Sequence, residues 1–239
     1  MFSCVSSAVV PQQHQQQQQA RYVDSQANVS HLQNATVAFV STDSEGDTSI
    51  FCSGFYVNED TIVSAAHCFE RSPIPMFPQL VAPGRVGQRF AFRTYEQFRN
   101  GNNRVAGPTN EASIVAVNSN LDLVVLHTVT PPREHLTISY ELPEVGSTVF
   151  SMGHPAGLPW MLSNGMVGSI FRTSRNEPEG IMCALPIYLG FSGGPVINNN
   201  GEVVGVVGAM LHRGSGMALA YPIANVARIY SGLNPPSRL

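Results

Sequence analysis

The stretch "GPVINNNGEVVGVVGAM" at residues 194–210 decides the fold class. It holds two apolar runs, and between them Asn200-Gly201 supplies the residue pair that a tight hairpin turn prefers. Valine is β-branched, and it favours strands over helices. The stretch therefore predicts two antiparallel strands joined by a β-hairpin.

The same pattern continues on both sides of this hairpin. From Ala35 onward, short β-branched and apolar runs alternate with turn residues, which is typical of an all-β sandwich or barrel and unlike alternating βαβ units. Only residues 224–233, "ANVARIYSGL", show a helical spacing of apolar side chains, with Gly232 as a stop. The other runs are ATVAFV (35–40), SIFCSGFYV (49–57), TIVSAAH (61–67), QRFAFRTY (88–95), ASIVAVN (112–118), LDLVVLHTV (121–129), STVFSMG (147–153), GMVGSIFR (165–172) and GMALAYPI (216–223).

A proline-rich segment at residues 128–146 separates these runs into two groups, and we interpret it as a linker between two β lobes. We expect an N-terminal lobe at residues 35–138 and a C-terminal lobe with a terminal helix at residues 139–239. The chain begins differently, because its first part includes the tract "PQQHQQQQQA" and holds little that could build a core. Residues 1–34 are therefore predicted to form a flexible, glutamine-rich tail.

Composition narrows the range of partners. Charged residues make up 12% of the 239 residues and the net charge is −3, which gives no electrostatic reason to expect nucleic acid or an anionic membrane as partner. All 13 basic residues are arginine, so chemistry that needs a lysine nucleophile or a P-loop lysine is excluded. No run approaches the length of about 18 apolar residues that spans a bilayer, and we expect no membrane insertion.

Ser192 in "GFSGGPV", residues 190–196, is compatible with an ordinary tight turn or with a nucleophile. A serine nucleophile needs a base, and His67 follows the apolar run "TIVSAA". The base needs a carboxylate, and Asp122 lies inside an apolar run, where an unpaired charge is costly. The glycines around Ser192 allow a turn whose N–H groups, those of Gly190 and Ser192, bind an oxyanion.

The cysteines add a possible constraint on His67. Cys68 follows it directly and lies 16 positions after Cys52. The two thiols would pair in an oxidising compartment or remain buried small side chains in a reducing one. The cysteine pair favours a secreted or other oxidising compartment, while the N-terminus has no basic region typical of a signal peptide. No other histidine has metal-ligand spacing with Cys, Asp or Glu, so we expect no metal site and no cofactor.

Together, "TIVSAAHC", "DLVVL" and "GFSGGPV" resemble the three catalytic blocks of trypsin-like serine peptidases with the chymotrypsin fold. The spacing of Cys52 and Cys68 resembles the disulfide around that family's histidine. In the second half, "VGSTVFSMGHPAGLP", "SNGMVGSI", "NGEVVGVVGA" and "GMALAYPI" resemble the HtrA-like branch. The resemblance implies two six-stranded antiparallel β-barrels with the site between them and a catalytic triad of His67, Asp122 and Ser192. We expect no PDZ domain, because the sequence ends soon after the predicted terminal helix.

The resemblance has one departure at the site. Phe191 stands where digestive members have an aspartate that pairs with a newly cleaved N-terminus, and no "IVGG"-like start is present. We therefore predict activity without N-terminal cleavage. In the family the S1 pocket is lined by residues corresponding to 183–190 and 206–210, and the first of these segments has no acidic residue here. This argues against a preference for Arg or Lys and favours a small or medium aliphatic P1 residue.

Three other residues receive structural interpretations. His154 in "GHPAGLP" is interpreted as a loop or surface histidine, Trp160 as packing at the edge of the second barrel, and Cys183 as a free buried thiol.

The functional prediction is a serine endopeptidase that acts on protein or peptide substrates through an acyl-enzyme. The alternatives are a protease-like binding module without turnover and a proteinase domain that processes a polyprotein.

Overall fold

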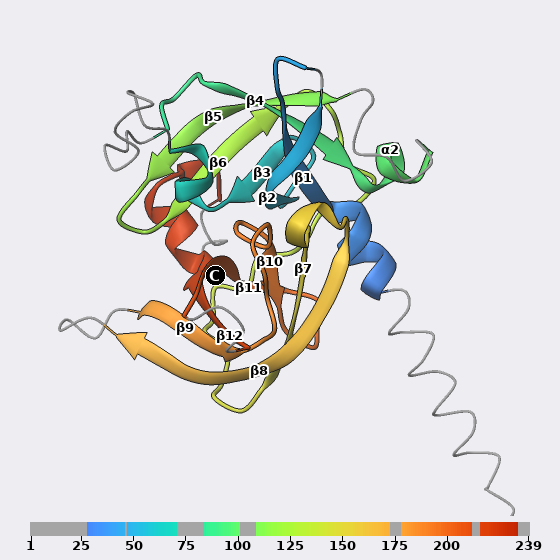
Figure 1. Ribbon diagram of the computed structural model, residues 1–239. Coiled ribbons are helices and arrows are strands. Elements are labelled where there is room, and N and C mark those ends of the chain that lie inside the picture. Colours follow the sequence, from blue (N-terminus) through green and yellow to red (C-terminus); the bar gives the residue numbers. More distant parts are fainter. Residues whose placement is uncertain are drawn as a thin grey trace, which may run out of the picture.

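The computed structural model describes residues 28–45, 47–70, 84–100, 109–172, 178–211 and 216–233 (Figure 1). Its strands form two closed, antiparallel, six-stranded barrels. The predicted fold class, an all-β chymotrypsin-like pair of barrels, is confirmed. The division of the chain at residue 138 stays a prediction.

The first barrel has the strand order β1-β2-β3-β6-β5-β4, and β4 closes it against β1. Its interior is apolar because the inward-facing positions are aromatic or branched, and the rings of Phe39 and Phe69 meet edge to face with centroids 4.9 Å apart. The strands are β1 (Thr36–Thr42), β2 (Thr48–Tyr56), β3 (Thr61–Ser64), β4 (Arg89–Thr94), β5 (Asn110–Asn118) and β6 (Leu123–Thr128).

The second barrel has the order β10-β11-β12-β9-β8-β7 and closes through β7 and β10. The predicted hairpin is present as β10 and β11, and its loop runs from Asn198 to Glu202, whose N–H and C=O groups meet at 2.9 Å. The Asn198 side chain also accepts from the Glu202 N–H at 3.0 Å, so the loop is longer than a two-residue turn. The strands are β7 (Thr148–Gly153), β8 (Met161–Arg172), β9 (Pro178–Ala184), β10 (Pro195–Ile197), β11 (Val203–Met210) and β12 (Met217–Pro222).

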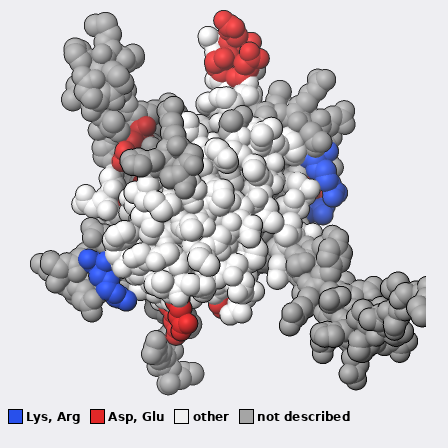
Figure 2. Space-filling view, turned by 60° about the horizontal axis from the view of Figure 1, so that its bottom comes forward, with Lys and Arg blue, Asp and Glu red and all other residues white. Residues whose placement is uncertain are grey.

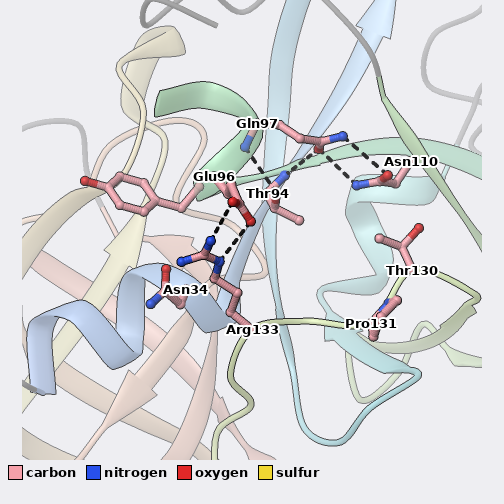
Figure 3. A pocket seen from close by; sticks show the side chains of 9 residues that line it. Asn34, Thr94, Glu96, Gln97, Asn110, Thr130, Pro131 and Arg133 are labelled. Atoms are coloured by element: carbon pink, nitrogen blue, oxygen red, sulfur yellow. Dashed lines mark hydrogen bonds and ion pairs between the residues drawn. The ribbon is translucent and has the colours of Figure 1, made fainter. Parts of the chain in front are cut away.

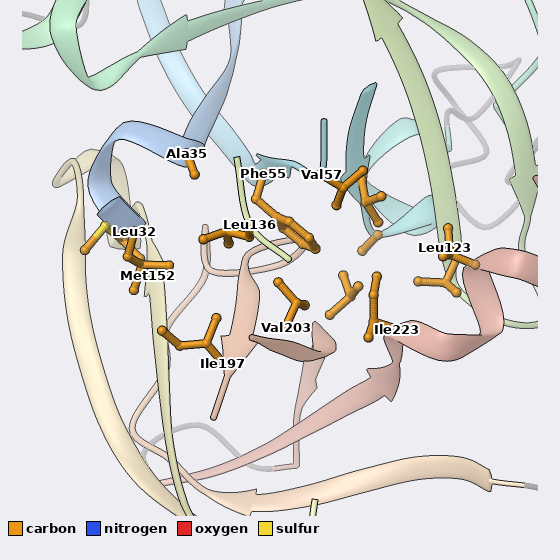
Figure 4. Packing of buried hydrophobic residues seen from close by; sticks show 14 of the residues in the cluster. Leu32, Ala35, Phe55, Val57, Leu123, Leu136, Met152, Ile197, Val203 and Ile223 are labelled. Atoms are coloured by element: carbon orange, nitrogen blue, oxygen red, sulfur yellow. The ribbon is translucent and has the colours of Figure 1, made fainter. Parts of the chain in front are cut away.

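A shared apolar core joins the two barrels (Figure 4). It includes Leu136 from the predicted linker, which is fully buried, and the Leu136 N–H donates to the Tyr56 carbonyl at 2.9 Å. The linker is thus packed between the barrels. Other members shown in Figure 4 are Leu32, Ala35, Phe55, Val57, Leu123, Met152, Ile197, Val203 and Ile223.

Two helical segments differ from the sequence prediction. Residues 28–35 are helical, and all but Ala35 lie within the segment predicted as a tail; Leu32 of this helix is buried in the shared core. The remaining residues of that segment, 1–27, lie outside the described residues. Helix α2 (Tyr95–Asn100) follows β4 directly, where the sequence suggested only strands. Its Tyr95 and Phe98 rings contact Trp160, so a tertiary contact stabilises a helix too short to be stable alone.

The predicted C-terminal helix is present as two short 3₁₀ turns, η3 (Ile223–Arg228) and η4 (Ser231–Leu233). Val226 of η3 is buried in the shared core, as its position on the predicted apolar face requires.

One face of the molecule carries few charged side chains. Figure 2 shows the face on the β8 side of the molecule, where the charged side chains lie near the margins. Strand β8 exposes Met161, Leu162, Met166 and Phe171. Within the described segments, no helix is both long enough and apolar enough to cross a membrane.

Candidate active site

His67 and Asp122 form a closely bonded pair at the end of the first barrel. His67 lies in the 3₁₀ turn η1 (Ala66–Phe69), which follows β3. The Asp122 carboxylate accepts from the His67 backbone N–H at 2.9 Å and from its imidazole Nδ1 at 2.8 Å. Because a carboxylate only accepts, Nδ1 carries a proton, and in the neutral ring Nε2 therefore has a free lone pair. This is the tautomer that a general base needs.

The position of Asp122 differs from the prediction, because the apolar run 121–129 predicts that Asp122 lies inside a strand. It precedes β6 in a turn and has a φ of 48°, a left-handed conformation that aspartate tolerates better than most residues. Its carbonyl accepts from the Ala66 N–H at 3.1 Å, which ties this turn to the segment that carries His67. The Asp122 side chain is 13% exposed and that of His67 is 41% exposed, so the carboxylate lies behind an accessible imidazole.

The pKa of His67 is raised above its ordinary value. The hydrogen bond that His67 donates to Asp122 is the largest cause, and the charges of Asp122 and Glu70 add to it. Partial burial acts in the opposite direction, because it disfavours the protonated ring. The surroundings of His67 therefore stabilise an imidazolium, the form that arises when the ring takes a proton.

The disulfide between Cys52 and Cys68 is present. It joins β2 to η1 and so holds the segment that carries His67 against the first barrel. Cys68 Sγ lies 4.0 Å from His67 Nε2 and 3.8 Å from the carbonyl oxygen of Ser192. The imidazole and the serine thus adjoin the same sulfur atom.

Ser192 lies in a turn that is bonded to both barrels. Its carbonyl accepts from the Ser53 N–H of β2 at 2.8 Å, and the Gly193 N–H donates to the Val207 carbonyl of β11 at 2.8 Å. A Cβ on Gly193 would lie 2.1 Å from Ser64 Oγ, so only glycine fits this approach. The turn is therefore seated on the first barrel although it belongs to the second.

The Ser192 hydroxyl is half-buried and directed at the Gly208 carbonyl, 3.5 Å away. A Cβ at Gly208 would lie 3.3 Å from Asp122 Oδ2, so this glycine adjoins both the serine and the carboxylate. Among the described residues no hydrogen bond joins Ser192 to His67. The structure thus gathers the three predicted residues in one place, with the Ser192–His67 hydrogen bond not made.

The two predicted oxyanion donors flank one buried aromatic residue. In the described part of the chain, neither the Gly190 nor the Ser192 N–H donates to another group. Gly190 has a φ of +104°, and a Cβ on it would lie 2.2 Å from the His154 carbonyl oxygen. Phe191, between them, is fully buried in the core of the second barrel, and its ring occupies the space beside Gly153 that a Cβ would need.

The interpretation of His154 as a surface histidine is wrong. His154 follows β7 in a loop but is completely buried, and burial lowers its pKa to about 3. Its Nδ1 lies 2.7 Å from Ser53 Oγ, and its ring meets the Trp160 ring edge to face at 4.6 Å. Trp160 is buried as predicted and donates to the Thr36 carbonyl at 3.2 Å. Sequence reasoning missed Ser53, whose only signal is its position directly after Cys52.

Other features of the described structure do not supply a second site of this kind. A polar cavity of about 190 Å³ lies beside α2 (Figure 3), and its charged and amide groups bond to one another. Arg133 pairs with Glu96 at 2.6 Å, and the amides of Gln97 and Asn110 meet at 2.9 Å. One group of potential metal ligands occurs among the described residues, Cys52, His67 and Cys68, but its two sulfur atoms are joined in the disulfide.

Comparison with known proteins agrees with this geometry. The family profile described as "Trypsin-like peptidase domain" matches residues 52–206, more than half of the chain. "Protease Do-like 5, chloroplastic" from Arabidopsis thaliana is 34% identical over 134 residues, which cover 50% of this chain and 41% of that protein. A "Probable periplasmic serine endoprotease DegP-like" from Halomonas elongata is 31% identical over 118 residues, 47% of this chain and 25% of that protein. The chain thus spans less than half of the length of these relatives.

Solved structures show the same fold. The active form of the Rv3671c protease from M. tuberculosis has a TM-score of 0.64 at 18% identity, covering 89% of this chain and 86% of that one. The serine endoprotease from Yersinia pestis has a TM-score of 0.60 at 20% identity, covering 84% and 63%. With the family match and the Do-like and DegP-like relatives, the predicted resemblance is confirmed: the chain belongs to the trypsin-like peptidase family, in its HtrA-like branch.

Proposed function

We propose that this protein is a serine endopeptidase that cleaves peptide bonds through His67, Asp122 and Ser192. The observation that carries the proposal is the 2.8 Å hydrogen bond from His67 Nδ1 to Asp122, beside the turn that holds Ser192. In the neutral ring, this bond leaves the lone pair on Nε2 of an exposed imidazole. If the Asp122–His67 pair served only to stabilise the fold, its imidazole would not need to be exposed or to have a lone pair on Nε2.

In the proposed reaction, Ser192 Oγ attacks the carbonyl carbon of the scissile peptide bond while His67 Nε2 takes the hydroxyl proton. The hydroxyl first turns about its Cα–Cβ bond, away from the Gly208 carbonyl and toward His67. Contacts between catalytic groups are often long before substrate binds, so the observed 3.5 Å contact with Gly208 is compatible with this step.

The negative charge that forms on the carbonyl oxygen is stabilised by the N–H groups of Gly190 and Ser192, which have no other acceptor among the described residues. His67 then gives its proton to the leaving amine as the C–N bond breaks, which leaves an acyl-enzyme on Ser192. Water attacks the ester carbon, its proton goes to His67, and the second product leaves as Ser192 Oγ recovers the proton.

The substrate preference that we propose is for a small or medium aliphatic P1 residue. The segment that precedes the serine, residues 183–190, has no acidic side chain, and its buried members Cys183, Leu185 and Ile187 belong to the core of the second barrel. Burial raises the pKa of the Cys183 thiol to about 11, which keeps it neutral. A cationic P1 side chain would find no counter-charge in this segment.

Labelling with a fluorophosphonate probe tests the proposal, because the probe reacts with an activated serine hydroxyl. The wild type should be labelled and should hydrolyse peptides, and Ser192→Ala should do neither. Ser49→Ala, which removes an exposed hydroxyl of β2, is the matched control and should behave as wild type.

A folded wild type that neither reacts with the probe nor cleaves a peptide library would contradict the proposal and favour a binding module without turnover. The missing Ser192–His67 hydrogen bond is the observation in favour of that alternative. A narrow P1 preference for Gln or Glu would instead favour processing of a polyprotein and contradict the aliphatic preference.

A further inference from the structure

A chain of hydrogen bonds ends on the peptide group of Gly190. Ser53 Oγ lies 2.7 Å from His154 Nδ1 and 2.7 Å from the Gly190 carbonyl oxygen. A carbonyl oxygen only accepts, so the Ser53 hydroxyl donates to Gly190. The hydroxyl has one proton, and it therefore accepts from His154 Nδ1–H. This places the lone pair of His154 on Nε2, which is buried and has no partner among the described residues.

This chain connects three parts of the molecule. Ser53 belongs to β2 of the first barrel, His154 follows β7 of the second, and Gly190 lies in the loop before Ser192. All the groups are held firmly, because Ser53 and His154 are completely buried and the His154 ring packs against Trp160. The His154 backbone N–H also reaches the Gly190 carbonyl, at 3.4 Å.

Gly190 needs such an anchor. It has no side chain that could pack, and its φ of +104° is one of many conformations open to glycine. Its own N–H belongs to the 189–190 peptide and must point toward substrate, so the carbonyl on the other side of its Cα is the group that can be held. The next peptide N–H, that of Phe191, donates to the Tyr188 carbonyl at 3.0 Å, so the 190–191 peptide is bonded at both ends.

We propose that Ser53 and His154 are positioning residues that hold the Gly190 carbonyl so that the Gly190 N–H stays directed at the oxyanion. The inference rests on the proposed function for its catalytic meaning. It goes beyond that function because it assigns a role to two buried residues that touch neither the substrate nor the triad side chains.

The test compares Ser53→Ala with Ser151→Ala. Both substitutions remove a completely buried hydroxyl, but Ser151 Oγ has no hydrogen-bond partner among the described residues. Kinetic constants are measured for a peptide substrate, together with the inhibition constant of a peptidyl trifluoromethyl ketone, whose adduct with Ser192 carries an oxyanion. Unfolding midpoints are measured for every variant.

Loss of an oxyanion donor costs about 100-fold or more in kcat, and a donor that is misdirected only part of the time should cost about 10-fold to 100-fold. Ser53→Ala should show this loss in kcat with little change in KM, and a parallel loss of ketone affinity. Ser151→Ala should keep both within about two-fold of wild type. Equal kcat values for the two variants, whether high or low, would overturn the inference.

A second pair of variants separates positioning from packing. His154→Asn places an amide nitrogen near the position of Nδ1, where it can donate to Ser53, and His154→Gln places one near Nε2. Both lose the ring that packs on Trp160, so both should lose stability. Only His154→Asn should keep most of the wild-type kcat, and equal kcat losses in the two variants would contradict a positioning role.

The crystal structures of wild type and Ser53→Ala provide a readout that does not need turnover. A 189–190 peptide that has rotated in Ser53→Ala, so that the Gly190 N–H points in a new direction, supports the inference, and a Gly190 N–H with unchanged direction overturns it. If the wild type is neither labelled nor active, the proposed function fails, and this comparison of the Gly190 peptide still decides whether Ser53 holds the loop.

Discussion

Asp122 binds His67 at two points, the backbone N–H and the imidazole Nδ1. Oδ1 accepts from the backbone N–H, and Nδ1 lies 2.8 Å from Oδ2 and 3.1 Å from Oδ1, so the carboxylate sets both the position and the rotation of the ring. The Asp122 carbonyl accepts in turn from the Ala66 N–H, one residue before His67. The geometry of the proposed base therefore depends on the turn that carries Asp122 as much as on its charge.

Asp122→Asn should lower kcat by about three to four orders of magnitude, because an amide does not stabilise the imidazolium and favours the wrong tautomer. It should also move the pH profile. Protonated His67 cannot act as base, so activity is lost as the pH falls through its pKa, which Asp122 raises above 6.5. The acid limb of kcat/KM should lie above pH 6.5 in the wild type and at lower pH in Asp122→Asn.

Glu70→Gln is the control for this profile, because Glu70 is the smallest of the causes that raise the pKa of His67. Its acid limb should move in the same direction by a smaller amount. A limb that stays in place in Asp122→Asn would show that another group controls the profile.

Reduction of the Cys52–Cys68 disulfide should destabilise the protein by about 3 kcal/mol, mainly because a loop of 16 residues gains freedom in the unfolded chain. Unfolding in guanidinium chloride with and without a thiol reductant measures the effect. Cys183→Ala should still respond to the reductant, and the double variant Cys52→Ala, Cys68→Ala should not. A wild type that is equally stable in both conditions would contradict the prediction.

Phe191→Ala should cost about 3 to 5 kcal/mol, since it removes a completely buried ring from the second barrel. Phe191→Leu fills more of the space and should cost less. Urea unfolding gives both values. A loss below 1 kcal/mol in Phe191→Ala would mean that the ring does not hold the loop of the proposed oxyanion donors.

The burial of Phe191 also supports activity without cleavage of the N-terminus. An apolar ring holds the position at which digestive relatives require a new ion pair, so the intact chain should hydrolyse peptides. Mass spectrometry of the active sample establishes that it is intact. An inert intact chain that gains activity on trimming would refute this expectation.

His154 should make the protein sensitive to acid. Burial lowers its folded-state pKa to about 3, while the unfolded value is about 6.5, so the unfolded state binds the proton first. Its contribution to stability is complete above about pH 6.5 and is lost by about 1.4 kcal/mol per pH unit as the pH falls toward 3. Its described contacts, Ser53, Gly190 and Trp160, carry no charge that would offset this effect.

Urea unfolding between pH 7 and pH 4 measures this dependence, with His154→Asn as the comparison because asparagine does not titrate. The variant should be less stable than wild type at pH 7 and should lose less stability on acidification. Parallel losses in the two proteins would rule out His154 as the cause.

The strands and the residues now found close together are marked by local patterns in the sequence, whereas the pair of six-stranded barrels and the disulfide were implied by the resemblance to trypsin-like peptidases. Alternating apolar runs predict strands, and His67, Asp122 and Ser192 each lie in a short motif. The conformation of Asp122 could not be predicted from the sequence in this way, because it depends on a turn closed by hydrogen bonds rather than on the apolar residues around it. Helix 28–35 was missed because its stability comes from Leu32 packing in a core built by distant segments.

The contacts of Ser53 show the same limit most clearly. Its side-chain partners lie 101 and 137 positions away, and no local pattern connects them. Buried polar groups need partners, but the sequence alone does not show which serine will be buried beside which histidine. Such residues become visible only when the barrels are placed against each other.

These separations also bear on how the protein reaches its native state. The contacts that join Ser53 to Gly190 and Trp160 to Thr36 close loops of 137 and 124 residues, while each barrel is built largely from neighbouring strands. Contacts between distant parts of a chain form slowly, because the entropy of loop closure opposes them until other contacts are in place. The proposed oxyanion donors are therefore among the last groups to be ordered, and secondary structure should be complete during refolding before activity returns.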